Sequence, residues 1–315
     1  MAGYLARRFL TAIVVCLGVT LVSFVMLHIA APNPGQAALG ARASQAAIAA
    51  YDKQNGYDRP IPVQFVTYLN HFIHGQLGWS YKFNQSVNAL FAEKTPLSAF
   101  LTGISLLLAV VIAIPLGIYQ AVKRNGMLDA AATTVAFVLY STPVYLVALI
   151  LQHIFADQLG WVSANVSQDQ SLAGALSDFK DLLLPILSLT AVAVAGFSRY
   201  QRSSSLDVLA QDYIRVARAK GLSERLVYTR HLLRNAILPT ITLLGLYVPF
   251  FIAGNILIEY TFNIDGLGLL FINALTDEDY NILISYTLIG AILTVIGNLI
   301  ADLALAAADP RIRIA

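Results

Sequence analysis

The sequence predicts an all-α integral membrane protein with six transmembrane helices. Of its 315 residues, 57% are hydrophobic and only 12% are charged, against roughly 25% charged residues in a typical soluble domain. The chain also contains several uncharged or nearly uncharged stretches of at least about 17 residues, the length that a membrane-spanning helix needs. Six stretches meet this test: 9–31, 97–119, 130–151, 182–198, 236–258 and 282–308.

Residues 1–31 are predicted to form a cytoplasmic N-terminus and the first transmembrane helix. Arg7 and Arg8 precede the apolar stretch, as basic residues do in a cleaved signal peptide. The apolar run is longer than the roughly 7 to 15 residues of a signal peptide, which favours a retained helix. Cys16 is the only cysteine, so the chain can form no internal disulfide, and we expect it to pack as a small apolar residue.

Residues 32–96 are too long for a simple turn between two spans, so we predict an external region with short helices. The alanine-rich segment 36–51 is typical of a helix, and 55–62 has the composition of a turn. From 63 to 73, apolar residues recur at helical spacing. That helix could lie at the membrane interface or pack against another span.

Residues 97–315 are predicted to form a core of five transmembrane helices. Four of the five spans contain proline, at Pro115, Pro143, Pro185 and Pro249. Proline can kink a transmembrane helix because it removes a backbone hydrogen bond. Kinked helices with few charges suit a translocation pathway that opens by rearrangement, although many other membrane proteins have them.

Charge within the spans is confined to Asp302, near the C-terminal end of the last one. We expect Asp302 to pair with Arg311, Arg313 or a basic residue of the large loop, and coupling to an ion is the alternative. Three amide or hydroxyl side chains could either line a passage or form hydrogen bonds between helices. They belong to Asn255, Thr294 and Asn298.

The loop after the fifth span contains Asp265, Gly266 and Gly268 within the run 262–268. Its two glycines permit a tight reversal of the backbone close to the membrane surface. Such a turn could simply join the span to a short helix, or it could act as a gate on a translocation path.

The distribution of Lys and Arg orients the predicted spans. With both termini inside, fourteen of the 20 Lys and Arg residues lie on the inner side and six on the outer side. Positive residues near spans are retained in the cytoplasm. We therefore expect both termini to be cytoplasmic, although the net charge of the whole chain is only +2.

The large cytoplasmic loop, 199–236, contains eight Lys and Arg residues and a predicted helix, stop and helix. Gly221 supplies the left-handed conformation that ends a helix, and the basic residues before it suit the negative end of the helix dipole. Ser223 can cap the next helix, with Glu224 in its first turn. We call 215–225 the elbow; it comprises Arg215, Val216, Ala217, Arg218, Ala219, Lys220, Gly221, Leu222, Ser223, Glu224 and Arg225.

A compact elbow of this kind is expected to present a rigid knob to a soluble partner, with Leu222 packed back on Val216 or Ala217. A basic cytoplasmic loop can also bind anionic lipid or nucleic acid. Attraction to lipid is compatible with the docking role. Nucleic-acid recognition lacks any accompanying motif in this sequence.

Motifs for catalysis or metal binding are missing from the sequence. It contains no G-x-x-x-x-G-K-[ST] phosphate loop, no H-E-x-x-H zinc motif and no G-x-S-x-G nucleophile turn. The five histidines lie on separate segments, where helix ends or the membrane interface are the expected positions. We therefore predict that the chain is not an enzyme by itself and binds no cofactor or metal.

Several motifs occur together in an order that is specific to one family. The elbow run RVARAKGLSE is followed by RHLLRNAILP at 230–239. Together they are similar to the cytoplasmic signature loop of bacterial ABC importer permeases, specifically the dipeptide/oligopeptide branch related to the B-type subunit. The resemblance covers nearly the whole chain through further matching segments at 57–64, 75–80, 114–117, 141–144, 262–268 and 309–313.

This resemblance implies a type I ABC importer permease fold in a bacterial inner (cytoplasmic) membrane. It implies three kinds of partner: a second homologous permease, two cytoplasmic ABC ATPase domains that bind ATP and Mg, and an external peptide-binding protein. The elbow would be the coupling helix that docks on one ATPase. Where the broader importer pattern begins Glu-Ala-Ala, this chain has Arg215, Val216 and Ala217, a departure similar to the peptide branch.

Other functions are compatible with the sequence. Related permeases transport nickel, haem or glutathione in place of dipeptides and oligopeptides. An ion-coupled secondary transporter would need a charged group within the membrane, and Asp302 is the one candidate. An integral membrane enzyme would need a convergent catalytic set, which the sequence does not contain.

Overall fold

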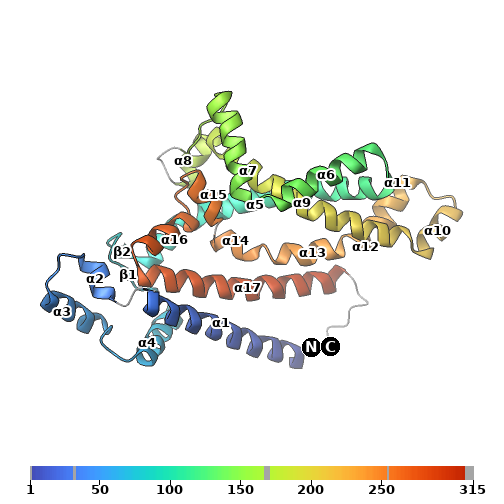
Figure 1. The fold of residues 1–315 in the computed structure, drawn as a ribbon. Helices are drawn as coiled ribbons and strands as arrows, with labels where there is room; N and C mark the ends of the chain where they lie inside the picture. The colour runs from blue at the N-terminus through green and yellow to red at the C-terminus, as the bar shows by residue number, and fades with distance from the viewer. Residues whose placement is uncertain (1, 31–32, 167–170, 254, 309–315) are drawn as a thin grey trace.

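The computed structural model describes residues 2–30, 33–166, 171–253 and 255–308 (Figure 1). Over these ranges the chain is mostly helical, with one two-stranded hairpin. Four helices are long and apolar enough to cross a membrane, and two bent pairs of helices bring the number of candidate spans to six. The predicted all-α membrane fold is confirmed, but the third and fifth spans are broken.

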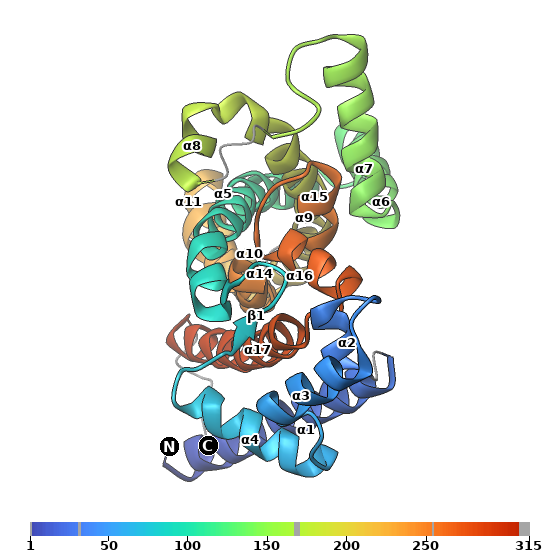
Figure 2. The ribbon, with the colours of Figure 1, turned by 90° about the vertical axis from the view of Figure 1, so that its left-hand side faces the viewer.

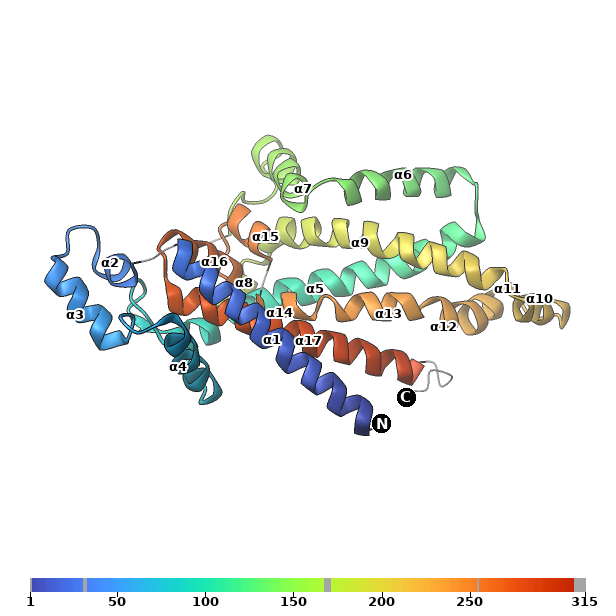
Figure 3. The same ribbon diagram turned by 60° about the horizontal axis from the view of Figure 1, so that its bottom comes forward.

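The four long helices are α1 (Ala2–Ala30), α5 (Val87–Val122), α9 (Phe179–Leu209) and α17 (Tyr280–Ala308). Helices α5 and α9 pack against each other along the middle of the molecule, and α17 lies between α1 and the fifth span (Figures 1 and 3). Gly117 brings α5 close to α9: a Cβ there would lie only 2.7 Å from the carbonyl oxygen of Ser198.

The third predicted span divides into α6 (Met127–Ser141) and α7 (Val144–Leu151), and a π-helical segment (Gln152–Gln158) extends α7. The two parts are bent by 107°. Pro143 causes the break because it disfavours helical conformation at the preceding residue, and Thr142 is indeed extended. The predicted stretch 130–151 is therefore a bent pair of helices, with the break at the proline that the sequence marked as a kink.

The fifth predicted span divides into α13 (Leu238–Gly245), α14 (Val248–Ala253) and α15 (Ile256–Thr261), and α16 (Leu267–Thr276) follows. The segment from α14 to α15 is bent by 47° relative to α13. Pro249 lies in the first turn of α14, where its missing N–H breaks no helical hydrogen bond. Pro115 and Pro185, in contrast, lie inside α5 and α9, which continue through them.

The region before α5 contains three short helices and a hairpin. One helix was expected over 36–51, but Gly40, at φ +83°, separates α2 from α3. Figure 2 shows these helices beside α1 and the hairpin beside α17. The elements are α2 (Pro34–Leu39), α3 (Gln45–Asn55), α4 (Ile61–Ile73), β1 (Trp79–Ser80) and β2 (Gln85–Ser86).

Helix α4 packs against the spans, one of the two placements that its sequence allowed. Phe65 and Tyr68 contact a buried cluster formed by Phe24 of α1 with Tyr280 and Ile284 of α17. The remaining elements are short and belong to the loops. They are α8 (Leu172–Ser177), α10 (Asp212–Ala219), α11 (Glu224–Leu226), a π-helical segment (Val227–Leu232) and α12 (Leu233–Ala236).

Candidate functional site

The elbow lies at one end of the molecule, beyond the ends of the long helices (Figures 1 and 3). Its stop has the geometry that the sequence predicted. Gly221 has φ +76°, its N–H donates to the carbonyl of Arg218 at 2.9 Å, and Leu222 N–H donates to that of Ala217 at 3.3 Å. These two bonds and the left-handed glycine form a Schellman motif, which satisfies the carbonyls at the end of α10.

The inner side of the elbow is apolar. Ile214, Ala217 and Val227 are buried against one another, and Leu222 packs on this cluster together with Val208 from the end of α9. The predicted return of Leu222 onto the preceding helix is confirmed on the Ala217 side, whereas Val216 is 52% exposed. Burial of this face fixes the elbow to the end of α9.

The outer side of the elbow is charged. Both guanidinium nitrogens Nε and Nη2 of Arg218 donate to the Glu224 carboxylate, at 2.9 and 3.2 Å. Hydrogen bonds from Tyr228 and Arg218 hold the pKa of Glu224 below its usual value. Ser223 occupies the predicted cap position, but its side chain forms no capping hydrogen bond. The Arg218–Glu224 pair therefore closes the elbow in place of a serine cap.

Most of the other elbow side chains are open to solvent. Arg215 is 73% exposed at the side chain and forms a 3.4 Å ion pair with Asp212 one turn earlier. Lys220 and Arg225 are also exposed. The elbow thus combines an apolar base with a basic outer surface, an arrangement suited to docking on a soluble partner.

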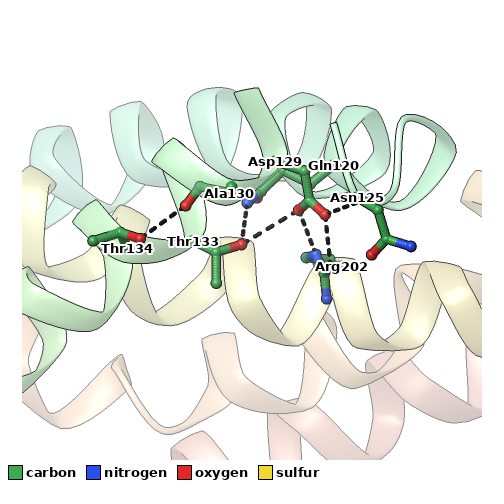
Figure 4. A network of polar contacts seen from close by, with 7 residues as sticks. All are labelled: Gln120, Asn125, Asp129, Ala130, Thr133, Thr134 and Arg202. Carbon is green, nitrogen blue, oxygen red and sulfur yellow. Dashed lines mark hydrogen bonds and ion pairs between the residues drawn. The ribbon is translucent and has the colours of Figure 1, made fainter. Parts of the chain in front are cut away.

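An ion pair that we call the brace ties the start of α6 to α9, near the end of α9 that leads to the elbow (Figure 4). Arg202 donates from Nε and Nη2 to the two carboxylate oxygens of Asp129, at 2.8 and 2.9 Å. Asp129 is 3% exposed and also accepts from the Asn125 backbone N–H at 3.0 Å and the Thr133 hydroxyl at 3.3 Å. A planar guanidinium bonded twice to one carboxylate fixes both distance and orientation.

A second buried contact joins α9 to the fifth span near the brace. Thr240 of α13 donates to the side-chain oxygen of Gln201 at 2.9 Å, and both residues are fully buried. Helix α9 is thereby connected to α6 and α13 near its C-terminal end, and the chain then continues into the elbow. Sequence reasoning missed Asp129, although an acid directly after a basic turn and before an apolar stretch was a signal for it.

At the opposite end of the molecule, α5 carries a row of polar side chains at four-residue spacing, which we call the polar ladder. Its members, Lys94, Ser98 and Thr102, lie on one face of the helix because 3.6 residues make a turn. Lys94 forms an ion pair with Asp265. Thr102 accepts from the Asn255 side-chain amide at 2.9 Å and donates to the Phe250 carbonyl at 2.9 Å.

The central contact of the polar ladder is a buried carboxylate that sequence reasoning did not single out. Glu259 in α15 is 1% exposed and accepts the Ser98 hydroxyl at 2.8 Å. Gly266 and Gly268 are required beside it, since a Cβ at either position would lie 2.3 or 3.0 Å from its Oε2 atom. The predicted tight turn at these glycines therefore surrounds a carboxylate.

Four of the six residues expected at a path or gate lie at the polar ladder, and Thr294 and Asn298 do not. The four are Asn255, Asp265, Gly266 and Gly268. Thr294 and Asn298 instead line an apolar groove of about 1020 Å³ between α1 and α17, near Cys16. Thr294 donates to the Gly290 carbonyl in its own helix at 2.8 Å.

Two further expectations concern charge and metals. Arg311 and Arg313, the expected partners of Asp302, lie outside the described residues. Over the residues that the structure describes, no three His, Cys, Asp or Glu side chains are grouped so that they could hold a metal ion.

Comparison with known proteins gives two family matches and several full-length relatives. Residues 113–314 match the family described as binding-protein-dependent transport system inner membrane component, and residues 1–102 match its N-terminal membrane component. The oligopeptide transport system permease protein AppB of Bacillus subtilis is 37% identical over 99% of both chains. A putative peptide permease protein of Brucella suis is 36% identical over 100% of both. The glutathione transport system permease protein GsiC of Salmonella typhimurium is 34% identical over 99% of both.

Proposed function

Because the chain belongs to the family of binding-protein-dependent transport system inner membrane components, we propose that it is the permease subunit of an ATP-driven importer of dipeptides or oligopeptides. It is a multi-pass membrane permease of the ABC importer class. The observation that carries the rest of the proposal is the elbow, a closed knob with a basic exposed surface at the end of the molecule.

In the proposed mechanism, the elbow 215–225 docks on one of two cytoplasmic ATPase domains, which bind ATP and Mg. The sequence supports a separate ATPase, since it contains no phosphate-binding loop. When the ATPases close, they move the elbow. The brace and the Gln201–Thr240 contact then carry this movement to α6 and α13, because a buried, doubly bonded ion pair resists separation.

We place both termini in the cytoplasm with the elbow, and the region 32–96 outside. The start of α1 and the end of α17 lie toward the elbow end, whereas α2 and α3 lie at the other end (Figures 1 and 3). The translocation path would run between this chain and a second homologous permease. Asn255, Asp265, Gly266 and Gly268 would belong to its outer gate, and Thr294 and Asn298 remain candidates for its wall.

The peptide substrate rests on the relatives, two of which have names that refer to oligopeptides or peptides. Glutathione is the second candidate, since a glutathione permease is similar over nearly the same length. Nickel and haem are further alternatives within the class. An external binding protein would select the substrate before it reaches this chain.

The test is purification and reconstitution with the second permease and ATPases of the same system. The chain should copurify with them from mild detergent, and vesicles of the complex should accumulate a labelled oligopeptide only with ATP and the external binding protein. Glutathione, nickel and haem are tested in parallel as substrates. Uptake by vesicles of this chain alone, driven by an ion gradient, would instead establish a secondary transporter.

A further inference from the structure

Glu259 is a buried carboxylate with four hydrogen-bond donors at the end of the molecule opposite the elbow. Its Oε1 atom accepts from the Ser98 hydroxyl at 2.8 Å and the Asn255 backbone N–H at 3.1 Å. Its Oε2 atom accepts from the backbone N–H groups of Gly268 at 2.7 Å and Leu269 at 3.3 Å. Four donors from three segments of the chain thus converge on one carboxylate.

The three segments belong to different elements of the fold. Asn255 precedes α15, Gly268 and Leu269 open α16, and Ser98 belongs to the long helix α5. The negative charge lies at the N-terminal end of α16, where the helix dipole favours an anion. Ser98 also accepts the Leu267 N–H at 2.9 Å, so one hydroxyl and one carboxylate together connect the start of α16 to α5.

The surrounding contacts attach α15 and α16 together to α5. Both helices are short, and the fifth span is interrupted before them. Asp265 and Asn255 contact the two outer members of the polar ladder, with Glu259 between them. Buried hydrogen-bonded charges rigidify a structure when every donor is satisfied, and the structure loosens when one partner is lost.

We propose that Glu259 is the positioning residue that holds α15 and α16 closed on α5 at the outer end of the permease, and that this contact controls substrate entry. The part about substrate entry rests on the proposed function. The part about position does not, because it depends only on contacts within this chain.

Glu259→Gln is the sharpest change, since it keeps the shape of the side chain but places an NH₂ group among four donors. If that NH₂ replaces Oε2, it faces the N–H groups of Gly268 and Leu269; if it replaces Oε1, it faces that of Asn255. Neither orientation satisfies the site. Ser98→Ala is the milder variant, and Glu278→Gln, at an exposed external glutamate, is the matched control.

The experiment measures how readily α16 separates from α5 in the full permease complex in vesicles. Cys16→Ser removes the only native thiol, and Ala274→Cys places a reporter on the buried face of α16. Glu259→Gln should raise labelling of this reporter by a membrane-impermeant maleimide about tenfold, the effect of losing one charge-assisted hydrogen bond. Ser98→Ala should raise labelling less, and Glu278→Gln should leave it unchanged.

The same complexes are tested for uptake and for ATP hydrolysis without substrate. Glu259→Gln should reduce uptake while ATP hydrolysis continues, a split that a general folding defect would not produce. Labelling equal to that of the control would overturn the positioning role. If the Glu259→Gln complex does not assemble, Ser98→Ala is tested in its place, and labelling equal to that of the control would again overturn the positioning role. Raised labelling with normal uptake would refute control of entry alone, and failure of the peptide assignment would leave the labelling result intact.

Discussion

Replacing Gly221 tests whether the conformation of the elbow couples the permease to ATP hydrolysis. Among the residues that the structure describes, none beyond its chain neighbours has an atom within 4 Å of the position that a Cβ would take there, so the cost of substitution comes from the backbone and not from a clash. At φ +76°, a residue with a side chain costs about 1–2 kcal/mol, and a β-branched residue costs more. Alanine should therefore lower the population of the closed elbow by roughly 5- to 30-fold.

The loss of coupling should increase from Gly221→Asn to Gly221→Ala and be greatest for Gly221→Val. Asparagine tolerates the left-handed region better than alanine or valine does. The chain offers a matched control at Gly160, which has φ +61° and equally open surroundings but lies far from the elbow. Gly160→Val introduces similar backbone strain. Only the Gly221 variants should change the coupling between ATP hydrolysis and peptide uptake.

The assay compares ATP-driven peptide uptake and ATP hydrolysis in reconstituted complexes, together with the thermal unfolding temperature. Gly221→Val should lose uptake, either by failing to retain the ATPases or by separating ATP hydrolysis from transport. Gly160→Val should lower the unfolding temperature without this separation. Normal uptake by Gly221→Val, or equal uncoupling by Gly160→Val, would refute the coupling role of the elbow.

Two further predictions concern the brace and the elbow pair. Arg202→Met should destabilise the permease by about 3–5 kcal/mol, because it leaves the buried Asp129 carboxylate without its counter-charge. Asp129→Asn should cost less, since the Arg202 side chain is 26% exposed. Denaturant unfolding of the single and double variants measures both losses, and additive losses would show that the two residues do not interact. The pKa of Glu224 is lowered in the folded chain, so its contribution to elbow stability is present above the unfolded pKa and declines as pH falls through the folded one. Hydrogen exchange of the elbow amides, corrected for intrinsic rates, should therefore be steady at neutral pH and faster under acid conditions. Glu224→Gln should abolish this change. An unchanged acid response in that variant would show that Glu224 does not cause the pH dependence.

Elements defined by neighbouring residues could be predicted from the sequence. The long helices follow from apolar length, and the stop at Gly221 follows from a glycine after basic residues at a helix end. The break at Pro143 could be predicted from the sequence only in part. Proline indicated a kink, but the 107° turn depends on how α7 packs against α9 and α15.

What the sequence by itself determined is the membrane fold, its six candidate spans and the elbow, because each depends on composition or on contacts a few residues apart. Only the tertiary structure decided which polar residues meet. Asp129 and Arg202 are separated by 73 residues, and Ser98 and Glu259 by 161. A buried carboxylate needs partners that satisfy its charge, and the packing of α6 against α9 and of α15 and α16 against α5 brings those partners into place.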